Sequence, residues 1–252
     1  MIRLVIPSDP GGKRILEHLY PINSSKNNWE NLNLEKIKFQ NYDEICIGTS
    51  VEMQIEKKIL SIAPINSVII VLDEVYNVQG RLKLLGKHLL KKIKQIIYIK
   101  GTPDKEIIPS IQHSFIRHPL LLDKNDNCKY VYDKSAPLLL IDEYKDLFHF
   151  IEMQGKYESN FLSNCASRSL SLVYRSHPAR NNKTISNYEG DKISGAIGYT
   201  TNYLIETLKK GIPTFTCSKP SVNCILNNNS KRNYKIIDLH GLKFVKLNLD
   251  IK

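Results

Sequence analysis

The chain has 252 residues, 42% of them hydrophobic, and its 36 Lys and Arg residues outnumber 25 Asp and Glu to give a formal net charge of +11. This composition excludes disordered and fibrous proteins and is sufficient for one large domain or two small ones. No apolar run approaches the roughly 18 residues of a membrane span, and the first residues lack the pattern of a signal peptide, so we expect a soluble, cytoplasmic protein. The five Cys residues include no CxxC pair, which favours free thiols over disulfides or a zinc site.

The first half alternates strand-like apolar runs with segments of helical spacing. Strands are expected at 1–7, 44–48, 67–73 and 95–101, followed by an apolar segment at 113–122, and helices at 13–22, 50–63 (after a Thr49/Ser50 cap), 80–93 and near 103–111. Strands that alternate with helices predict parallel βαβ units with helices on both faces of a sheet.

The polar residues 123–136 interrupt this rhythm and are typical of a linker. Beyond them, strands are expected at 137–143, 171–177, 193–198, 212–217, 234–239 and 242–249, and helices at 143–166 and 201–210. The pattern predicts an α/β protein with two Rossmann-like domains, 1–132 and 133–252, whose parallel sheets face a central cleft. Ligands of such sheets bind outside the carboxyl ends of the strands.

One candidate phosphate site lies in GAIGYTTNYLIETLKKGIP, residues 195–213. Gly198 would let the chain turn sharply, and Thr200 and Thr201 place two hydroxyls and free backbone N–H groups at the start of the helix expected at 201–210. An anion there would gain from the positive end of the helix dipole. The structural alternative is an ordinary Thr cap with a Gly stop at the other end of the helix.

A basic cluster in LVYRSHPAR, residues 172–180, falls at the carboxyl end of a predicted strand in the same half. Arg175 and Arg180 supply forked donors suited to phosphate oxygens, and His177 can donate a hydrogen bond or a proton near neutral pH. The alternative is a loop histidine without a function. A second tripeptide of this kind, Arg117-His118-Pro119, is interpreted as structural.

Acidic pairs end two predicted strands, at Asp73-Glu74 and Asp142-Glu143. A general base for an acceptor hydroxyl needs such a carboxylate, and Asp73 or Glu74 in the first half fits best. The alternative for this pair is a helix cap or a salt bridge to Arg81. SDPGG at 8–12 looks like a phosphate loop but lacks the spacing of either glycine-rich motif.

RSHP at 175–178 together with GYTTNYLIETLKKGIP at 198–213 resembles bacterial GT-B-type glycosyltransferases, particularly the sialyltransferase and polysialyltransferase-like groups. In the first half, SDPGG, IGTSVEMQIEKKILSIAP and VIIVLDEVYNVQGRL are similar to the N-terminal half of GT-B-like proteins. The resemblance implies a GT-B-like fold with an acceptor-side first domain and a nucleotide-donor second domain.

The same resemblance implies roles for individual residues. The HP histidine and a hydroxyl pair contact the donor phosphate in these families, which here points to His177, Thr200 and Thr201. The catalytic base belongs to an acidic pair followed by Gly, whereas Val75 follows Asp73-Glu74 here. Similar features in CDP-glycerol phosphotransferases favour a cytidine-nucleotide donor.

We therefore expect a metal-independent glycosyltransferase without a cofactor. It would move a sugar, with a sialic-acid-like nonulosonate as one candidate, from a CMP-linked or other nucleotide-sugar to a hydroxyl of a cell-surface glycan or glycolipid. The basic balance predicts peripheral association with anionic membrane at its inner face, and the lysine-rich stretches include too few aromatics to favour nucleic acid. The alternatives are a CDP-polyol phosphotransferase-like enzyme, a nucleotide-sugar epimerase, and a non-catalytic nucleotide- or glycan-binding protein.

Overall fold

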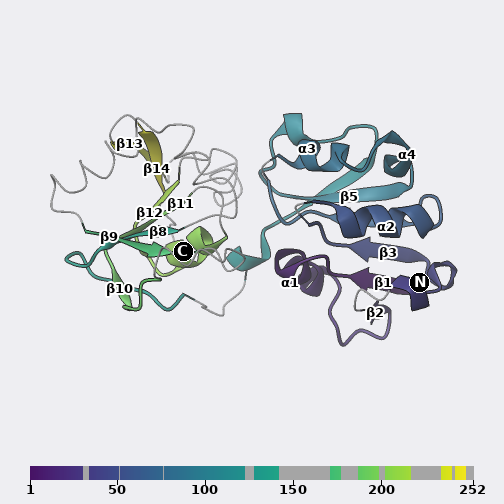
Figure 1. The fold of residues 1–252 in the computed structure, drawn as a ribbon, viewed down its shortest axis with the longest axis horizontal. Coiled ribbons are helices and arrows are strands. Elements are labelled where there is room, and N and C mark those ends of the chain that lie inside the picture. The colour runs from purple at the N-terminus through teal and green to yellow at the C-terminus, as the bar shows by residue number, and fades with distance from the viewer. Residues whose placement is uncertain are drawn as a thin grey trace. The chain divides into compact units, whose positions relative to one another are not determined.

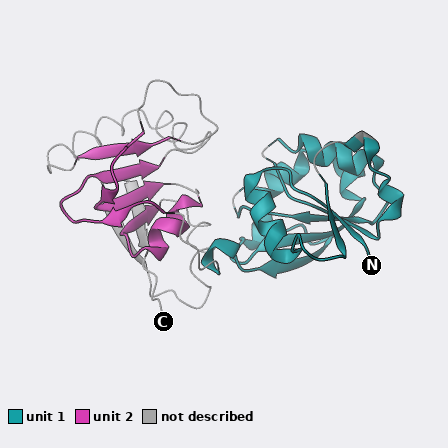
Figure 2. Ribbon diagram, turned by 90° about the horizontal axis from the view of Figure 1, so that it is seen from below, with its two compact units in different colours: residues 1–122 teal, residues 123–252 magenta. Residues whose placement is uncertain are grey.

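The chain folds into two compact units, residues 1–122 and 123–252 (Figure 2). The computed structural model describes residues 1–30, 34–50, 52–75, 77–122, 128–141, 171–176, 187–198, 202–216, 234–239 and 242–247. Each unit contains a six-stranded sheet, accompanied by several helices in unit 1 and by one described helix in unit 2, so the predicted α/β class with parallel strands is confirmed. The division after residue 122 lies ten residues before the domain boundary that the sequence predicts, at 132/133.

The sheet of unit 1 is entirely parallel, in the order β2-β1-β3-β4-β5-β6 (Figure 1). Its strands are β1 (Arg3–Ile6), β2 (Asn27–Trp29), β3 (Glu44–Ile47), β4 (Val68–Val71), β5 (Ile93–Ile99) and β6 (Gln112–Ile116). All residues of β3 and β4 are buried. This explains their nearly continuous apolar sequences, because helices cover both faces of such a sheet.

The helices of unit 1 bury apolar side chains against this sheet. They are α1 (Pro10–Leu19), α2 (Gln54–Ile62), α3 (Val78–Lys83) and α4 (Lys87–Leu90), with 3-10 turns η1 (Leu34–Lys36), η2 (Phe39–Asn41), η3 (Asp104–Glu106) and η4 (Pro119–Leu121). Together with the strands they form one core, in which Leu60 and Leu82 are fully buried.

Three expectations for unit 1 differ from the structure. The helix expected at 80–93 is divided into α3 and α4, because Gly86 has a φ of +78°, which a helix cannot continue through. The helix expected near 103–111 is only the single turn η3. The short edge strand β2 was not predicted, since its sequence NNW carries no alternating apolar pattern.

Unit 2 contains a mixed sheet in the order β13-β14-β12-β11-β8-β9. Its strands are β8 (Leu138–Ile141), β9 (Leu172–Arg175), β11 (Gly195–Gly198), β12 (Thr214–Thr216), β13 (Tyr234–Leu239) and β14 (Leu242–Leu247); β7 (Val131–Tyr132) and β10 (Lys192–Ile193) form a separate pair, and α7 spans Tyr203–Lys209. The last two strands were expected, but they pair antiparallel. Only two residues separate them in the sequence, too few for the crossover that parallel strands need.

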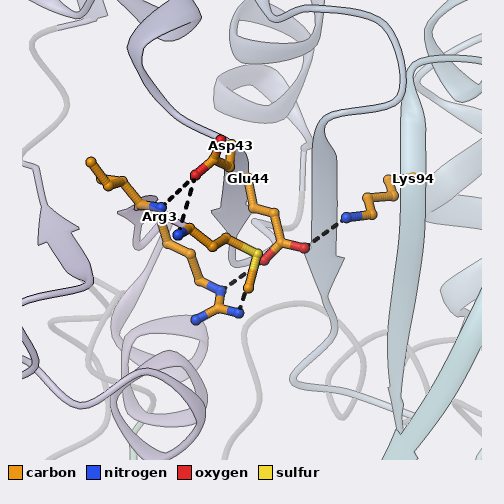
Figure 3. Close-up of polar contacts among 6 residues, drawn as sticks. Arg3, Asp43, Glu44 and Lys94 are labelled. Carbon is orange, nitrogen blue, oxygen red and sulfur yellow. Dashed lines mark hydrogen bonds and ion pairs between the residues drawn. The ribbon is translucent and has the colours of Figure 1, made fainter.

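An ion-pair cluster joins three strands at the amino edge of the unit 1 sheet (Figure 3). Arg3 Nε donates to Glu44 Oε2 at 2.7 Å, and Lys94 Nζ donates to Glu44 Oε1 at 2.7 Å. The Glu44 side chain is only 10% exposed. Burial alone would raise its pKa, but the hydrogen bonds and charges of Lys94 and Arg3 outweigh burial and lower the pKa of Glu44 below its ordinary value.

We predict that Glu44→Gln lowers the free energy of unfolding of unit 1 at pH 7 by about 1–3 kcal/mol, because two cations lose their shared acceptor. A carboxylate whose pKa is lowered by folding stabilises the folded state at pH values above its unfolded-state pKa. This contribution disappears as the pH falls through the folded-state pKa. The difference between wild type and variant should therefore shrink in acid.

Denaturant titration followed by Trp29 fluorescence measures this effect in unit 1, because Trp29 is the only tryptophan of the chain. The matched control is Asp43→Asn, which removes a neighbouring carboxylate whose side chain is 61% exposed and should cost less than 1 kcal/mol. Equal losses for both variants would contradict a special role for the Glu44 cluster.

Candidate functional site

The site in unit 1 begins at a point where the strand order reverses. From β1 the chain continues to β2 on one side of the sheet, and from β3 it continues to β4 on the other. The loops that follow β1 and β3 therefore diverge at the carboxyl edge, where open α/β sheets bind ligands. Ser8 Oγ donates to the Gly48 carbonyl at 2.9 Å, and a Cβ on Gly12 would lie 3.1 Å from Gly48 Cα. Two glycines thus allow the two loops to touch.

Asp9 caps α1 at this edge. Its Oδ1 accepts a hydrogen bond from Gly12 N at 2.7 Å, and its backbone is extended as at an ordinary N-cap. Burial raises the pKa of Asp9, although the Gly12 N–H, Arg81 and the Gly11 N–H act to lower it. The Asp9 carboxylate occupies N–H groups that a phosphate would need, so SDPGG acts here as a cap with an acidic side chain.

Asp73 lies two residues beyond the end of β4 and is only 6% exposed. Thr49 Oγ1 donates to Asp73 Oδ1 at 3.1 Å. Arg81 Nη2 lies 3.6 Å from the same Oδ1 and 3.4 Å from Glu74 Oε2. The salt bridge that formed the structural alternative for this acidic pair is therefore present.

This ion pair does not keep the pKa of Asp73 at its ordinary value. Its pKa is raised to about 7, first by burial and then by the negative charges of Glu74 and Asp9, against the opposing effects of Arg81 and the Thr49 hydrogen bond. One guanidinium faces three carboxylates, so it cannot compensate for the burial of each. A carboxyl group that titrates near neutral pH can accept a proton from a bound hydroxyl and release it again.

The two oxygens of Asp73 have different surroundings. Oδ1 contacts Thr49 and Arg81, whereas Oδ2 faces Gly11, where a Cβ would approach Oδ2 more closely than real Cβ atoms do. Gly11 is therefore required by close approach, because Oδ2 packs directly against it. Arg81 is 6% exposed, and its Nε has no hydrogen-bond partner among the described residues. Its fixed charge is directed mainly at the acidic pair.

Unit 2 brings together two segments of the predicted phosphate site. The Arg175 guanidinium, at the end of β9, lies over the Tyr203 ring with Cζ 3.7 Å from the ring centroid, and Tyr203 is the first residue of α7. Tyr203 also lies edge-on to Tyr130, with ring centroids 6.2 Å apart. Arg175 is thus held next to the start of the helix for which a phosphate site was predicted.

The other predicted residues of unit 2 are placed differently. Gly198 is buried at the end of β11 and pairs with Thr216 of β12, so it belongs to the strand rather than to a sharp turn. Four predicted site residues, His177, Arg180, Thr200 and Thr201, lie outside the described residues, as does the acidic pair at 142–143.

Sequence reasoning did not identify Asp9 and Thr49 as site residues. The sequence did contain a signal for Asp9, because Asp before Pro-Gly-Gly is typical of a helix N-cap. Thr49 was expected as a cap of the next helix, but it bonds to Asp73, while Ser50 N donates to Glu56 Oε1 at 2.5 Å near the start of α2. His118 has the structural role predicted for it, since its Nδ1 accepts from Leu120 N at 3.3 Å and caps η4.

A scan against models of known protein families and a search of curated proteins each found no match to this chain. Within the described residues, no group of three or more His, Cys, Asp or Glu side chains is arranged to hold a metal ion. None of the helices in the described part of the chain is long and apolar enough to cross a membrane.

We predict that Asp73→Asn stabilises unit 1 at pH 8, by on the order of 2 kcal/mol, because the ionised carboxylate is buried among like charges. The raised folded-state pKa means that the wild type binds this proton more tightly when folded. The contribution of the Asp73 proton to the stability of the wild type is fully present at pH values below the unfolded-state pKa of about 4. This contribution is lost as the pH rises towards 7. The gain in the variant should therefore disappear in acid.

Unfolding followed by Trp29 fluorescence at pH 8 and pH 4 measures this difference. Loss of stability at pH 8 would show that the Arg81 ion pair dominates, as expected for a purely structural role of Asp73.

Proposed function

We propose that this protein is a glycosyltransferase of the GT-B type, in which Asp73 is the general base that deprotonates the acceptor hydroxyl. The observation that carries the proposal is the buried position of Asp73 at the carboxyl end of β4, with its pKa raised to about 7. The acceptor proton would pass to Asp73, and the acceptor oxygen would bond to the anomeric carbon of the donor sugar. The bond from that carbon to the donor phosphate would break, with its electron pair leaving on the phosphate oxygen.

The surroundings of the acidic pair favour Asp73 over Glu74 as the base. The Glu74 side chain is 43% exposed, so water can solvate its charge, whereas the Asp73 side chain is 8% exposed. Glu74 contributes by raising the pKa of Asp73 through its negative charge. Thr49 and Arg81 both contact Oδ1, so we propose that Oδ2, which lies next to Gly11, is the oxygen that receives the proton.

The donor side of the proposal rests on Arg175 and on the sequence around it. Tyr203 covers one face of the Arg175 guanidinium, so the in-plane N–H groups of Arg175 remain the natural donors to phosphate oxygens. We propose that Arg175, His177 and Arg180 neutralise the leaving phosphate, and that Thr200, Thr201 and the start of α7 bind it. The proposed donor is a nucleotide-sugar, with a CMP-linked sugar the first to test, and the proposed acceptor is a glycan hydroxyl.

We predict that Asp73→Asn lowers kcat for sugar transfer by at least about 100-fold, the lower limit for loss of a general base. Binding of the donor nucleotide should be unchanged, since Asp73 belongs to unit 1 and the proposed phosphate contacts belong to unit 2. In the wild type, kcat should rise with pH through about 7 as Asp73 loses its proton.

The assay follows CMP release from CMP-sugars, with and without glycan acceptors, across this pH range. Asp43→Asn is the matched control, because it neutralises a carboxylate at the opposite edge of the same sheet and should retain full activity. If the wild type binds nucleotide but turns over no donor in an acceptor screen, the non-catalytic alternative replaces this proposal.

We predict that CMP or CDP raises the melting temperature of the wild type, because a ligand that binds only the folded state stabilises it. His177→Ala and Arg175→Ala should each reduce this shift by weakening phosphate contacts, while Lys134→Ala, an exposed cation of the same unit, should not. A thermal-shift screen against CMP, CDP, UDP and GDP makes the measurement. A response confined to UDP would contradict the cytidine preference.

A further inference from the structure

Unit 1 carries an exposed surface of mixed lysines and aliphatic side chains at the amino edge of its sheet. One part is the end of α2 and the turn that leads into β4, and the other is α4 and the turn that leads into β5. We define the amino-edge surface by their exposed side chains: Lys58, Ile62, Ile65, Lys87, His88 and Lys91. It lies at the opposite end of the strands from Asp73, because β4 and β5 both begin here.

The two parts of the amino-edge surface are held together. Lys92 Nζ donates to the carbonyl oxygens of Ser61 at 3.0 Å and Ala63 at 3.2 Å, which joins the residues before β5 to the end of α2. Helices α2 and α4 also contact each other directly. The surface is therefore a continuous and fixed feature of unit 1.

Two isoleucines of this surface are exposed to an unusual degree for their type. Ile65 is 77% exposed and Ile62 is 54% exposed. Ile65 sits in a tight turn, in which Asn66 has a φ of +60° and Ser67 Oγ donates to the Pro64 carbonyl at 2.8 Å. The turn holds Ile65 away from the core, so its side chain adds little to folding but is available for burial against a partner.

The segments that form this surface are basic, and the carboxylates of Asp43 and Glu44 at the same edge are paired with the Met1 amino group and with Arg3 and Lys94. The sequence contains no Asp or Glu at 57–72 or at 75–103, and the second stretch includes seven Lys and Arg residues. Lys94 forms an ion pair with Glu44, whereas Lys58, Lys87 and Lys91 are exposed. The amino-edge surface is therefore complementary to an anionic partner.

We propose that the amino-edge surface binds an anionic lipid bilayer, with Ile62 and Ile65 inserted among the head groups and the lysines contacting lipid phosphates. Exposed aliphatic side chains surrounded by lysines are the combination that interfacial membrane binding uses. Nucleic acid would gain little from isoleucines, and no Phe, Tyr or Trp side chain belongs to this surface for bases to stack on. The proposal is independent of the chemistry proposed for Asp73.

The test is co-sedimentation of the full chain with vesicles of phosphatidylcholine alone and of phosphatidylcholine mixed with phosphatidylglycerol. We expect binding only to the anionic vesicles, and weaker binding as salt is added. Lys87→Glu/Lys91→Glu should lower the partition coefficient by at least about 25-fold, since each basic side chain near such a surface contributes a factor of about five. Ile62→Ser/Ile65→Ser should weaken binding without changing the net charge.

Matched controls come from elsewhere in unit 1. Lys100→Glu/Lys105→Glu makes the same charge change at exposed positions beyond the carboxyl end of β5, and Leu122→Ser removes an aliphatic side chain that is 43% exposed. Both should bind anionic vesicles like the wild type. Absence of vesicle binding, equal binding to neutral vesicles, or equal losses in the controls would overturn the proposal, as would a preference for homopolymeric RNA over anionic vesicles in competition.

Discussion

The arrangement of the candidate site depends on one guanidinium that faces more negative charge than it can balance. Arg81 is buried between Asp73 and Glu74, and Asp9 adds a third carboxylate to the same edge of the sheet. Removing one partner from a buried ion pair normally destabilises a protein strongly, because the remaining charge is left uncompensated. Here the excess of carboxylates reverses that expectation for Asp73. The salt bridge and the catalytic interpretation are therefore compatible, since Arg81 keeps the acidic pair in place without fixing the charge of Asp73.

At the opposite edge of the same sheet, cations outnumber the carboxylate that they contact. At the amino edge, Arg3 and Lys94 share the single carboxylate of Glu44, and the pKa of Glu44 is lowered despite its burial. At the carboxyl edge the pKa of Asp73 is raised to about 7. Burial raises the pKa at both sites; two cations outweigh it at Glu44, whereas at Asp73 the single cation does not outweigh burial and the two neighbouring carboxylates. One edge of unit 1 thus stabilises the fold, and the other buries a carboxyl group whose pKa is raised, at a cost in stability when that group is ionised.

The sequence predicted those parts of the fold that depend on the pattern of neighbouring residues along the chain. The strands β3 and β4 were evident as apolar runs because they are buried on both faces, and Asp73 was evident as a carboxylate at a strand end. The edge strand β2 pairs with β1 through backbone hydrogen bonds, which do not depend on a particular side-chain pattern, so the sequence NNW did not predict a strand. The contact between Thr49 and Asp73 depends on the order of β1, β3 and β4 in the sheet. No local pattern contains that order, so the partners of Asp73 could not be predicted.

Membrane binding at the amino edge and catalysis by Asp73 at the carboxyl edge would together limit which acceptors can reach Asp73. Strand β5 has seven residues and separates the amino-edge surface from the carboxyl edge by about 20 Å, given a rise of roughly 3.3 Å per residue. A bilayer bound at the amino-edge surface would thus lie at the far end of the sheet from Asp73. A lipid-linked sugar at the level of the head groups could not reach Oδ2 of Asp73 from that position. An extended glycan of several sugars could cross this distance, so membrane binding at the amino edge favours elongation of a chain over its initiation on lipid.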